Sequence, residues 1–234
     1  MLQTLAHRIL AHLPSQCAVC RAWPSQAVCE DCVVRFAQPV LRCRTCALPV
    51  PTGVQQCGEC LIRPPPLDAC VAAVNYAYPW SNLIVGYKFN AHTGRAALFA
   101  LLLKSTPWVE PALDQADLVL PLPLSRQRLR ERGFNQALLL AQQLAPQKTD
   151  GQLLLRIRDA TPQSQLKRDQ RLHNVKDAFA VEPLRAHQVK DKRIVVVDDV
   201  MTSGASLYSA AATLKAAGAG HITAMVIART PAPS

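Results

Sequence analysis

A run near the C-terminus combines the residue types that bind a phosphorylated sugar. Residues 195–206 read Val-Val-Val-Asp-Asp-Val-Met-Thr-Ser-Gly-Ala-Ser, so an apolar strand leads to two carboxylates and a hydroxyl-rich turn then opens a helix. Ligands of open α/β sheets bind at this end of the strands. Backbone N–H groups at a helix start, with nearby hydroxyls, can surround a phosphate monoester. The predicted phosphate-binding residues are Thr202, Ser203, Gly204, Ala205 and Ser206.

Two adjacent acids, Asp198 and Asp199, lie just before this turn. There they can accept hydrogen bonds from the vicinal hydroxyls of a ribose, which makes them the predicted catalytic residues. The alternative is a strand, an Asp turn and a Ser-capped helix with no ligand. Each of these elements is common alone, but their combination is not. No glycine–lysine loop of the nucleotide triphosphatase type occurs in the sequence as a competing phosphate site.

Eight of the nine cysteines form four Cys-x-x-Cys pairs, with 8, 10 and 10 residues between successive pairs. Two thiolates separated by two residues can share one metal ion, and zinc takes four ligands in a tetrahedron. Eight ligands therefore predict two structural Zn²⁺ sites, closed to chemistry, while Cys70 stays outside the set. The predicted ligands are Cys17, Cys20, Cys29, Cys32, Cys43, Cys46, Cys57 and Cys60.

The short spacers favour sequential grouping of the pairs, although interleaved grouping stays open. A disulfide framework is the competing interpretation, and it requires an oxidising compartment. The N-terminal 14 residues lack the apolar core and cleavage site of an export signal, so we expect a cytoplasmic protein. A redox Cys-x-x-Cys motif is disfavoured because such motifs usually occur once. No apolar run approaches the roughly 20 residues that cross a bilayer, so we expect no membrane insertion.

The net charge of +10 is concentrated in one region. Residues 118–193 contain 15 Lys or Arg against 7 Asp or Glu. Such a surface suits a polyanion, either a diphosphate-bearing small molecule or a nucleic-acid backbone. A solvated surface that only keeps the protein soluble is the alternative.

The hydrophobic pattern alternates between strands and helices. We expect strands at 71–78, 117–120, 153–157, 194–197 and 222–228, helices at 95–103, 135–144 and 206–217, and a short helix or turn at 83–87. This alternation predicts an α/β fold with a mainly parallel sheet flanked by helices. The stiff segment Arg63-Pro64-Pro65-Pro66 predicts a boundary between a double zinc-ribbon module at 1–63 and an α/β domain at 67–234.

The acidic pair and the Thr-Ser-Gly-Ala-Ser turn resemble the motif of type I phosphoribosyltransferases. Further runs, preceded by the four Cys pairs, resemble the competence protein F (ComF-like, GntX-like) family over nearly the whole chain. These runs are Tyr87-Lys88-Phe89, Pro121-Leu122-Pro123-Leu124, Arg132-Gly133-Phe134-Asn135-Gln136, Gln165, Arg171-x-x-Asn174-Val175 and Ala178-Phe179. The family more often has Thr-Thr-Gly-x-Thr at the turn, but the hydroxyls are retained here, so we expect little loss of binding.

The resemblance implies that the phosphate loop binds phosphoribosyl diphosphate together with Mg²⁺. It implies a diphosphate loop at 121–125, including Leu122, Pro123 and Leu124, and a phosphate contact from Lys88. The basic segment 163–174 is implied to be a flexible hood over the ligand. Hood or nucleic-acid contacts are expected from Arg126, Arg128, Arg132, Gln165, Arg168 and Arg171. The alternating arginines from 126 to 132 share one face if extended and spread around the axis if helical.

Two functions compete. The resemblance implies a role in DNA uptake during natural transformation, with single-stranded DNA and a helicase-like ATPase of the competence machinery as partners. The alternative is an active phosphoribosyltransferase that transfers ribose 5-phosphate to an unknown base and has no connection with DNA. Zinc knuckles and a basic surface suit a sugar-phosphate backbone. Aromatic residues are only 5% of the chain, however, so a platform for stacking several bases is not evident.

Overall fold

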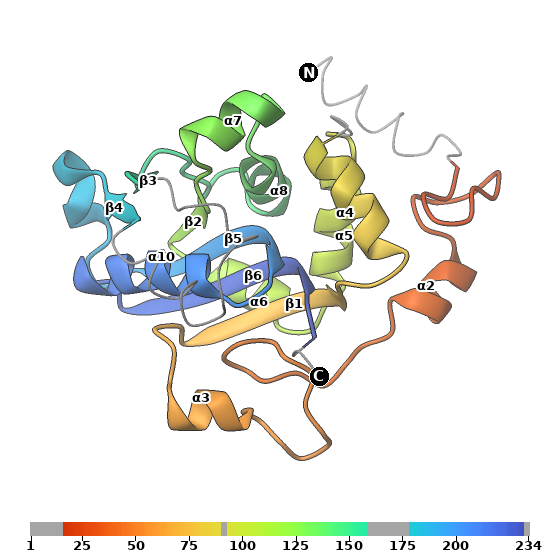
Figure 1. Cartoon of the computed structure of the whole chain (residues 1–234), viewed down its shortest axis with the longest axis horizontal. Coiled ribbons are helices and arrows are strands. Elements are labelled where there is room, and N and C mark those ends of the chain that lie inside the picture. Colours follow the sequence, from red (N-terminus) through yellow and green to blue (C-terminus); the bar gives the residue numbers. More distant parts are fainter. Residues whose placement is uncertain (1–15, 90–92, 159–177, 232–234) are drawn as a thin grey trace. The chain divides into compact units, whose positions relative to one another are not determined.

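The computed structural model describes residues 16–89, 93–158 and 178–231 (Figure 1). By internal contacts the chain divides into two compact units, Met1–Gln38 and Pro39–Ser234. The predicted domains 1–63 and 67–234 stay a prediction about which segments fold independently. The internal contacts place the second two cysteine pairs, Cys43 to Cys60, in the larger unit. Within the described ranges, no helix has the length and apolar character needed to span a bilayer.

The described part of the smaller unit, residues 16–38, contains two cysteine pairs and one short helix. The pair at Cys17 and Cys20 lies in a tight turn, and the pair at Cys29 and Cys32 surrounds the start of α2 (Glu30–Phe36). This unit is the first half of the predicted zinc-ribbon module.

The larger unit is built on a four-stranded, all-parallel sheet with the strand order β1-β6-β5-β2. The central strands are almost continuously buried, as expected when helices cover both faces of a parallel sheet. The predicted mainly parallel α/β fold is thus confirmed. The strands are β1 (Ala69–Asn75), β2 (Leu118–Pro121), β5 (Arg193–Met201) and β6 (His221–Arg229).

Helices pack on both faces of this sheet. Ile194 and Val196 of β5 pack into one core with Leu207 and Leu214 of α10 (Ala205–Ala216). Side chains alternate along a strand, so Val195 faces the other side, where it lies near Ala112 of α6. Besides α10, the described helices of the larger unit are α3 (Gly58–Ile62), α4 (Trp80–Phe89), α5 (Arg95–Lys104), α6 (Val109–Gln115), α7 (Arg126–Arg132) and α8 (Gln136–Leu144).

The predicted strand at 153–157 exists but does not join the main sheet. Its core, β3 (Leu154–Arg156), pairs antiparallel with β4 (Phe179–Val181) as a separate ribbon, which the 3₁₀ helix η2 (Pro183–Gln188) follows. The ribbon packs on the α10 side, because Leu154 and Phe179 belong to the same core as Leu207. Most of the residues between β3 and β4 lie outside the described ranges.

Candidate phosphoribosyl site and metal sites

The predicted phosphate loop, residues 202–206, connects the end of β5 to the start of α10, in the strand–turn–helix order that the sequence predicts. Strand β5 ends at Met201, and Gly204 caps α10 in the left-handed region with φ +82°. A Cβ at this position would lie 2.6 Å from Met201 Cε and from the Tyr208 ring, so a side chain is excluded by both backbone conformation and space. The loop surrounds a hollow of about 40 Å³ lined by Asp198, Thr202, Ser203, Gly204, Ala205 and Ser206, with Val200, Met201 and Leu207.

Asp198 is the acid that lines this hollow. It is half-buried, and the backbone N–H of Asp199 donates to its Oδ1 at 2.8 Å. Burial and repulsion from Asp199 raise the pKa of Asp198 to about 7, although Lys88 and Arg132 oppose this shift. A carboxylate with this pKa changes its charge near neutral pH and gains from any cation that binds beside it.

Asp199 is more deeply buried than Asp198 and forms an ion pair with Lys88. The two side chains meet at 2.9 Å between Lys88 Nζ and Asp199 Oδ1, with the Asp199 side chain 4% exposed. Its second oxygen, Oδ2, is buried without a hydrogen-bond partner among the described residues. A buried carboxylate oxygen without a partner is costly. The site therefore fits an additional hydroxyl donor or a metal ion at this oxygen.

A second cation reaches the acids from α7. The guanidinium of Arg132 lies 4.9 Å from the centre of the Phe89 ring, next to Lys88 in sequence. Burial lowers the pKa of Arg132, while the charges of Asp199 and Asp198 raise it. Two cations and two carboxylates from three separate elements thus converge beside the phosphate loop.

The predicted diphosphate loop is attached directly to β5. The N–H of Leu122 donates to Val197 O at 2.8 Å, and Asn135 Nδ2 donates to Leu122 O at 3.2 Å. Leu122 is buried, whereas Pro123 and Leu124 are partly exposed. Ser125 caps α7 by accepting from the N–H of Arg128 at 3.1 Å. The loop backbone is therefore held next to the strand that carries the acids.

The arginines of 126–132 are helical, which settles the alternative that the sequence left open. Arg126, Arg128 and Arg130 are exposed on α7, and none has an ion pair within the part of the chain that the structure describes. The charges of Asp199 and Asp198 act on Arg132, the fourth arginine of this helix, and raise its pKa against the effect of burial. The predicted hood residues Gln165, Arg168 and Arg171 lie outside the described residues.

The cysteines form two groups in the sequential arrangement. In each group the four Sγ atoms lie within 4.8 Å of one another. Tetrahedral ligands about 2.3 Å from a zinc ion lie about 3.8 Å apart. The observed Sγ–Sγ distances of 3.6 Å, for Cys20–Cys29 and for Cys46–Cys57, fit this geometry. All nine cysteines are free of disulfides, and Cys70 belongs to neither group.

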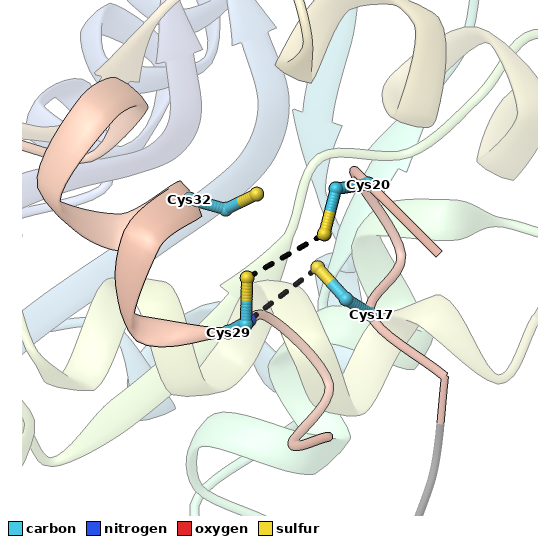
Figure 2. A group of neighbouring side chains, drawn as sticks. All are labelled: Cys17, Cys20, Cys29 and Cys32. Carbon is cyan, nitrogen blue, oxygen red and sulfur yellow. Dashed lines mark hydrogen bonds between the residues drawn. The ribbon is translucent and has the colours of Figure 1, made fainter. Parts of the chain in front are cut away.

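The first group lies in the smaller unit. Its four sulfurs point toward a common centre in Figure 2, and the N–H of Cys29 donates to Cys17 Sγ at 3.4 Å. Burial alone would raise the pKa of the Cys17 thiol, but backbone N–H groups, including those of Cys20 and Cys29, lower it to about 6. This thiolate is thereby prepared for a metal ion, which binds the deprotonated form.

The second group is part of the core of the larger unit. Cys43, Cys46 and Cys60 are buried in one cluster with Met201 and Leu207, the residues on either side of the phosphate loop. The two cysteine groups therefore have different surroundings. The first lies in the smaller unit, and the second lies in the core of the larger unit next to the predicted phosphate loop.

Comparisons with known proteins agree with this architecture. The chain is 32% identical over 227 residues to the DNA utilization protein YhgH of Salmonella typhimurium, covering 93% of this chain and 98% of the relative. It is 30% identical over 195 residues to competence protein F of Haemophilus influenzae, covering 80% and 84%. This chain belongs to the competence protein F family. Residues 130–233 also match the phosphoribosyl transferase domain.

Competence protein ComFC of Bacillus subtilis is a partial match, 31% identical over 118 residues, which cover 50% of this chain and 46% of that protein. In this chain, a phosphoribosyltransferase-type domain is thus combined with two groups of four cysteines.

Two residues of the Arg-Gly-Phe-Asn-Gln run at 132–136 have structural roles that the sequence analysis did not predict. Asn135 caps α8, because its Oδ1 accepts a hydrogen bond from the N–H of Ala137 at 2.9 Å. The Nδ2 of the same side chain donates to the carbonyl of Leu122. The carbonyl of Gln136 accepts from Tyr87 Oη at 2.7 Å, which fixes α4 next to α8. The Asn before a helical pattern is an N-cap signal that could have revealed the first role. The second role depends on a contact across 49 residues.

Proposed function

We propose that this protein binds phosphoribosyl diphosphate with Mg²⁺ at the carboxyl end of β5. The observation that supports this most is the hollow lined by Asp198 and the loop 202–206, together with Asp199 Oδ2, which is buried and has no hydrogen-bond partner in the described part of the chain. A cup of backbone N–H groups and hydroxyls suits a phosphate monoester. Carboxylates one step away suit ribose hydroxyls and a hard cation. Phosphoribosyl diphosphate carries all of these groups in one molecule.

Each side chain has a part in this proposal. The loop from Thr202 to Ser206 holds the 5′-phosphate, and Asp198 and Asp199 accept hydrogen bonds from the ribose hydroxyls. Lys88 and Arg132, with the loop backbone at 122–124, offset the charge of the diphosphate. Asp198 and Asp199 are also the residues that would hold Mg²⁺, which neutralises diphosphate charge when it is bound. The Lys88–Asp199 ion pair must then exchange partners when the ligand arrives.

The affinity for this ligand is expected to rise with pH through about 7. In this proposal the carboxylate of Asp198 binds the ligand in its ionised form, and in the free protein the pKa of Asp198 is about 7. Binding therefore releases a proton below this pH, and affinity should be about tenfold weaker at pH 6 than at pH 8 from this group alone. Calorimetry in two buffers of different ionisation enthalpy measures the released proton. The ligand's own phosphates also titrate, so Asp198→Asn is the control: a profile equally steep in that variant would contradict the assignment.

We further propose that the protein acts on single-stranded DNA in the cytoplasm during DNA uptake, with a helicase-like ATPase of the competence machinery as a partner. Two curated relatives carry names that refer to competence or DNA utilization. Three exposed arginines of α7 without described ion pairs offer a backbone-binding surface next to the ligand site. Both cysteine groups are proposed to hold Zn²⁺, the metal that four thiolates favour.

The proposed DNA contact predicts that the affinity for single-stranded DNA falls with salt and requires the arginines of α7. Replacing Arg126, Arg128 and Arg130 by Gln should weaken binding of a single-stranded oligonucleotide about tenfold at low salt. It should also reduce the slope of log K against log salt by about 2, at roughly 0.7 per phosphate contact. Fluorescence anisotropy across a salt series measures both. The matched control replaces Lys190, Lys192 and Arg193, three exposed cations at the opposite end of β5. Equal losses in the two triple variants would reject α7 as the contact.

Catalysis is the alternative outcome for the same site. Incubation with phosphoribosyl diphosphate, Mg²⁺ and a panel of bases would release diphosphate if the protein is a transferase. Stable binding with no diphosphate release would indicate that the ligand regulates the protein instead of being consumed.

A further inference from the structure

One buried arginine joins the second cysteine group to the phosphate loop. Arg229, the last residue of β6, is 4% exposed. Its Nε donates to the carbonyl of Cys46 at 2.8 Å. Its Nη1 donates to the carbonyl of Met201 at 3.0 Å and also to that of Thr202. A single guanidinium therefore contacts the backbone of a metal-ligand cysteine and the first residues of the phosphate loop.

These contacts fix the start of the loop. Met201 pairs with Arg229 in the sheet and also accepts from the backbone N–H and the Oγ1 of Thr230, both at 3.1 Å. The carbonyls of Met201 and Thr202 thus point at the guanidinium. Their orientation helps set the direction of the N–H groups that follow at Ser203 and Gly204. On the other side, the sulfur of Met201 lies 3.6 Å from Cys70 Sγ.

Arg229 lacks an acidic partner. Across the described ranges its hydrogen bonds go to carbonyl groups and one hydroxyl, and no carboxylate forms an ion pair with it. Arg42 is similar: it donates to Ala47 O at 3.1 Å and to Asn75 Oδ1 at 2.9 Å. Two largely covered cations that form no ion pair with a carboxylate of the described residues are costly unless another negative charge compensates them.

The second cysteine group supplies that charge. Four thiolates around a divalent metal carry about two negative charges in total, equal to the two positive charges of Arg42 and Arg229. Arg42 precedes Cys43 in the chain, and Arg229 is bonded to Cys46. Cys70 does not serve, because burial raises the pKa of its thiol to about 12 and keeps it neutral.

We propose that Arg229 is a positioning residue that couples metal in the second cysteine group to ligand binding in the phosphate loop. This rests on the proposed function. The metal–thiolate charge holds the guanidinium in place, and the guanidinium holds the carbonyls of the loop. Because coupling is reciprocal, metal and phosphoribosyl diphosphate each strengthen the binding of the other. The first group, Cys17 to Cys32, takes no part in this coupling.

Metal release from the folded protein tests the coupling. The zinc-loaded protein is mixed with excess chromogenic chelator, and the two release phases are followed with and without saturating phosphoribosyl diphosphate and Mg²⁺. Saturating ligand should slow one phase at least about fivefold and leave the other unchanged. A Cys17→Ser plus Cys20→Ser variant, which retains only the second site, assigns the slowed phase. The first site thus serves as an internal control in the wild-type protein.

Substitutions of Arg229 separate coupling from general stabilisation. Arg229→Met removes the charge but keeps a side chain of similar length. Arg229→Lys keeps the charge, but a single ammonium group cannot donate to the Cys46 carbonyl and to the loop carbonyls at the same time, as the planar guanidinium does. At ligand concentrations that saturate each variant, the slowing of metal release should fall below about twofold, while Arg193→Met should behave as wild type. Full slowing in Arg229→Met, or equal slowing of both phases in wild type, would overturn the coupling. Wild-type protein that binds no ligand would reject the proposed function and the coupling with it.

Discussion

Replacing Asp198 and Asp199 together by Ala is expected to abolish measurable binding of phosphoribosyl diphosphate with Mg²⁺. The double variant removes the acid that lines the hollow and the buried carboxylate whose Oδ2 lacks a hydrogen-bond partner among the described residues. It also leaves Lys88 without its partner inside the site. Loss of charged hydrogen bonds of about 1.5–3 kcal/mol each predicts an affinity at least about a hundredfold weaker. Isothermal titration calorimetry measures it directly.

Asp114→Ala is the matched control for this pair. Asp114 is exposed on α6, away from the carboxyl end of β5, and the contact it provides to Lys148 comes from its backbone carbonyl. This control should bind as the wild type does. Unchanged affinity in the double variant, or an equal loss in the Asp114 control, would reject the assignment of the site.

Disrupting the two cysteine groups is expected to have very different consequences. Metal should be found at about two ions per chain, and Cys43→Ser plus Cys46→Ser should remove one ion and unfold the larger unit. This follows because the second group lies in the main core and a structural zinc site contributes on the order of 10 kcal/mol or more. Cys17→Ser plus Cys20→Ser should also remove one ion, but the unfolding transition of the larger unit should stay in place. Elemental analysis and circular dichroism melts measure both effects.

The two variants remove the same pair of ligand types, so each serves as a control for the other. Equal destabilisation by both would mean that the eight cysteines form one folding module. That outcome would favour the boundary at 63–67 over the division after Gln38. A metal content near zero in the wild type would remove the metal interpretation for both groups.

Local sequence patterns were sufficient to predict the elements that have a strong hydrophobic periodicity or a distinctive motif. The apolar run before Asp198 predicts a buried strand, and Gly204 between hydroxyl residues predicts the turn at its end. The strand was predicted too short, since β5 continues through both acids to Met201. Pairing with β6 extends it, because main-chain hydrogen bonds to a buried neighbour override the low strand propensity of Asp.

Elements that depend on tertiary contacts could not be predicted in this way. Helix α6 contains Pro111 in its first turn, where proline is tolerated, but its seven residues have no clear period. The ribbon of β3 and β4 joins segments more than 20 residues apart, and nothing local indicates antiparallel pairing. Helix α7 was left open, because its charged residues fit either an extended or a helical segment.

The sequence predicted which residue types make up the candidate site, but not the contacts between residues that lie far apart in the chain. The residue types at 198–206 indicate a sugar phosphate without any structure. The ion pair between Lys88 and Asp199 joins residues 111 positions apart, and only the fold brings them together. Arg229 gives no local signal at all, since an arginine at the end of an apolar strand normally reaches solvent. Its role arises from the cysteine group packed against it.

A crystal structure of the protein with phosphoribosyl diphosphate and Mg²⁺ tests the central claim most directly. The 5′-phosphate is expected within hydrogen-bonding distance of the backbone N–H groups between Ser203 and Ser206, with the ribose hydroxyls facing Asp198 and Asp199. Ligand density elsewhere on the chain, with this loop empty, would contradict the account.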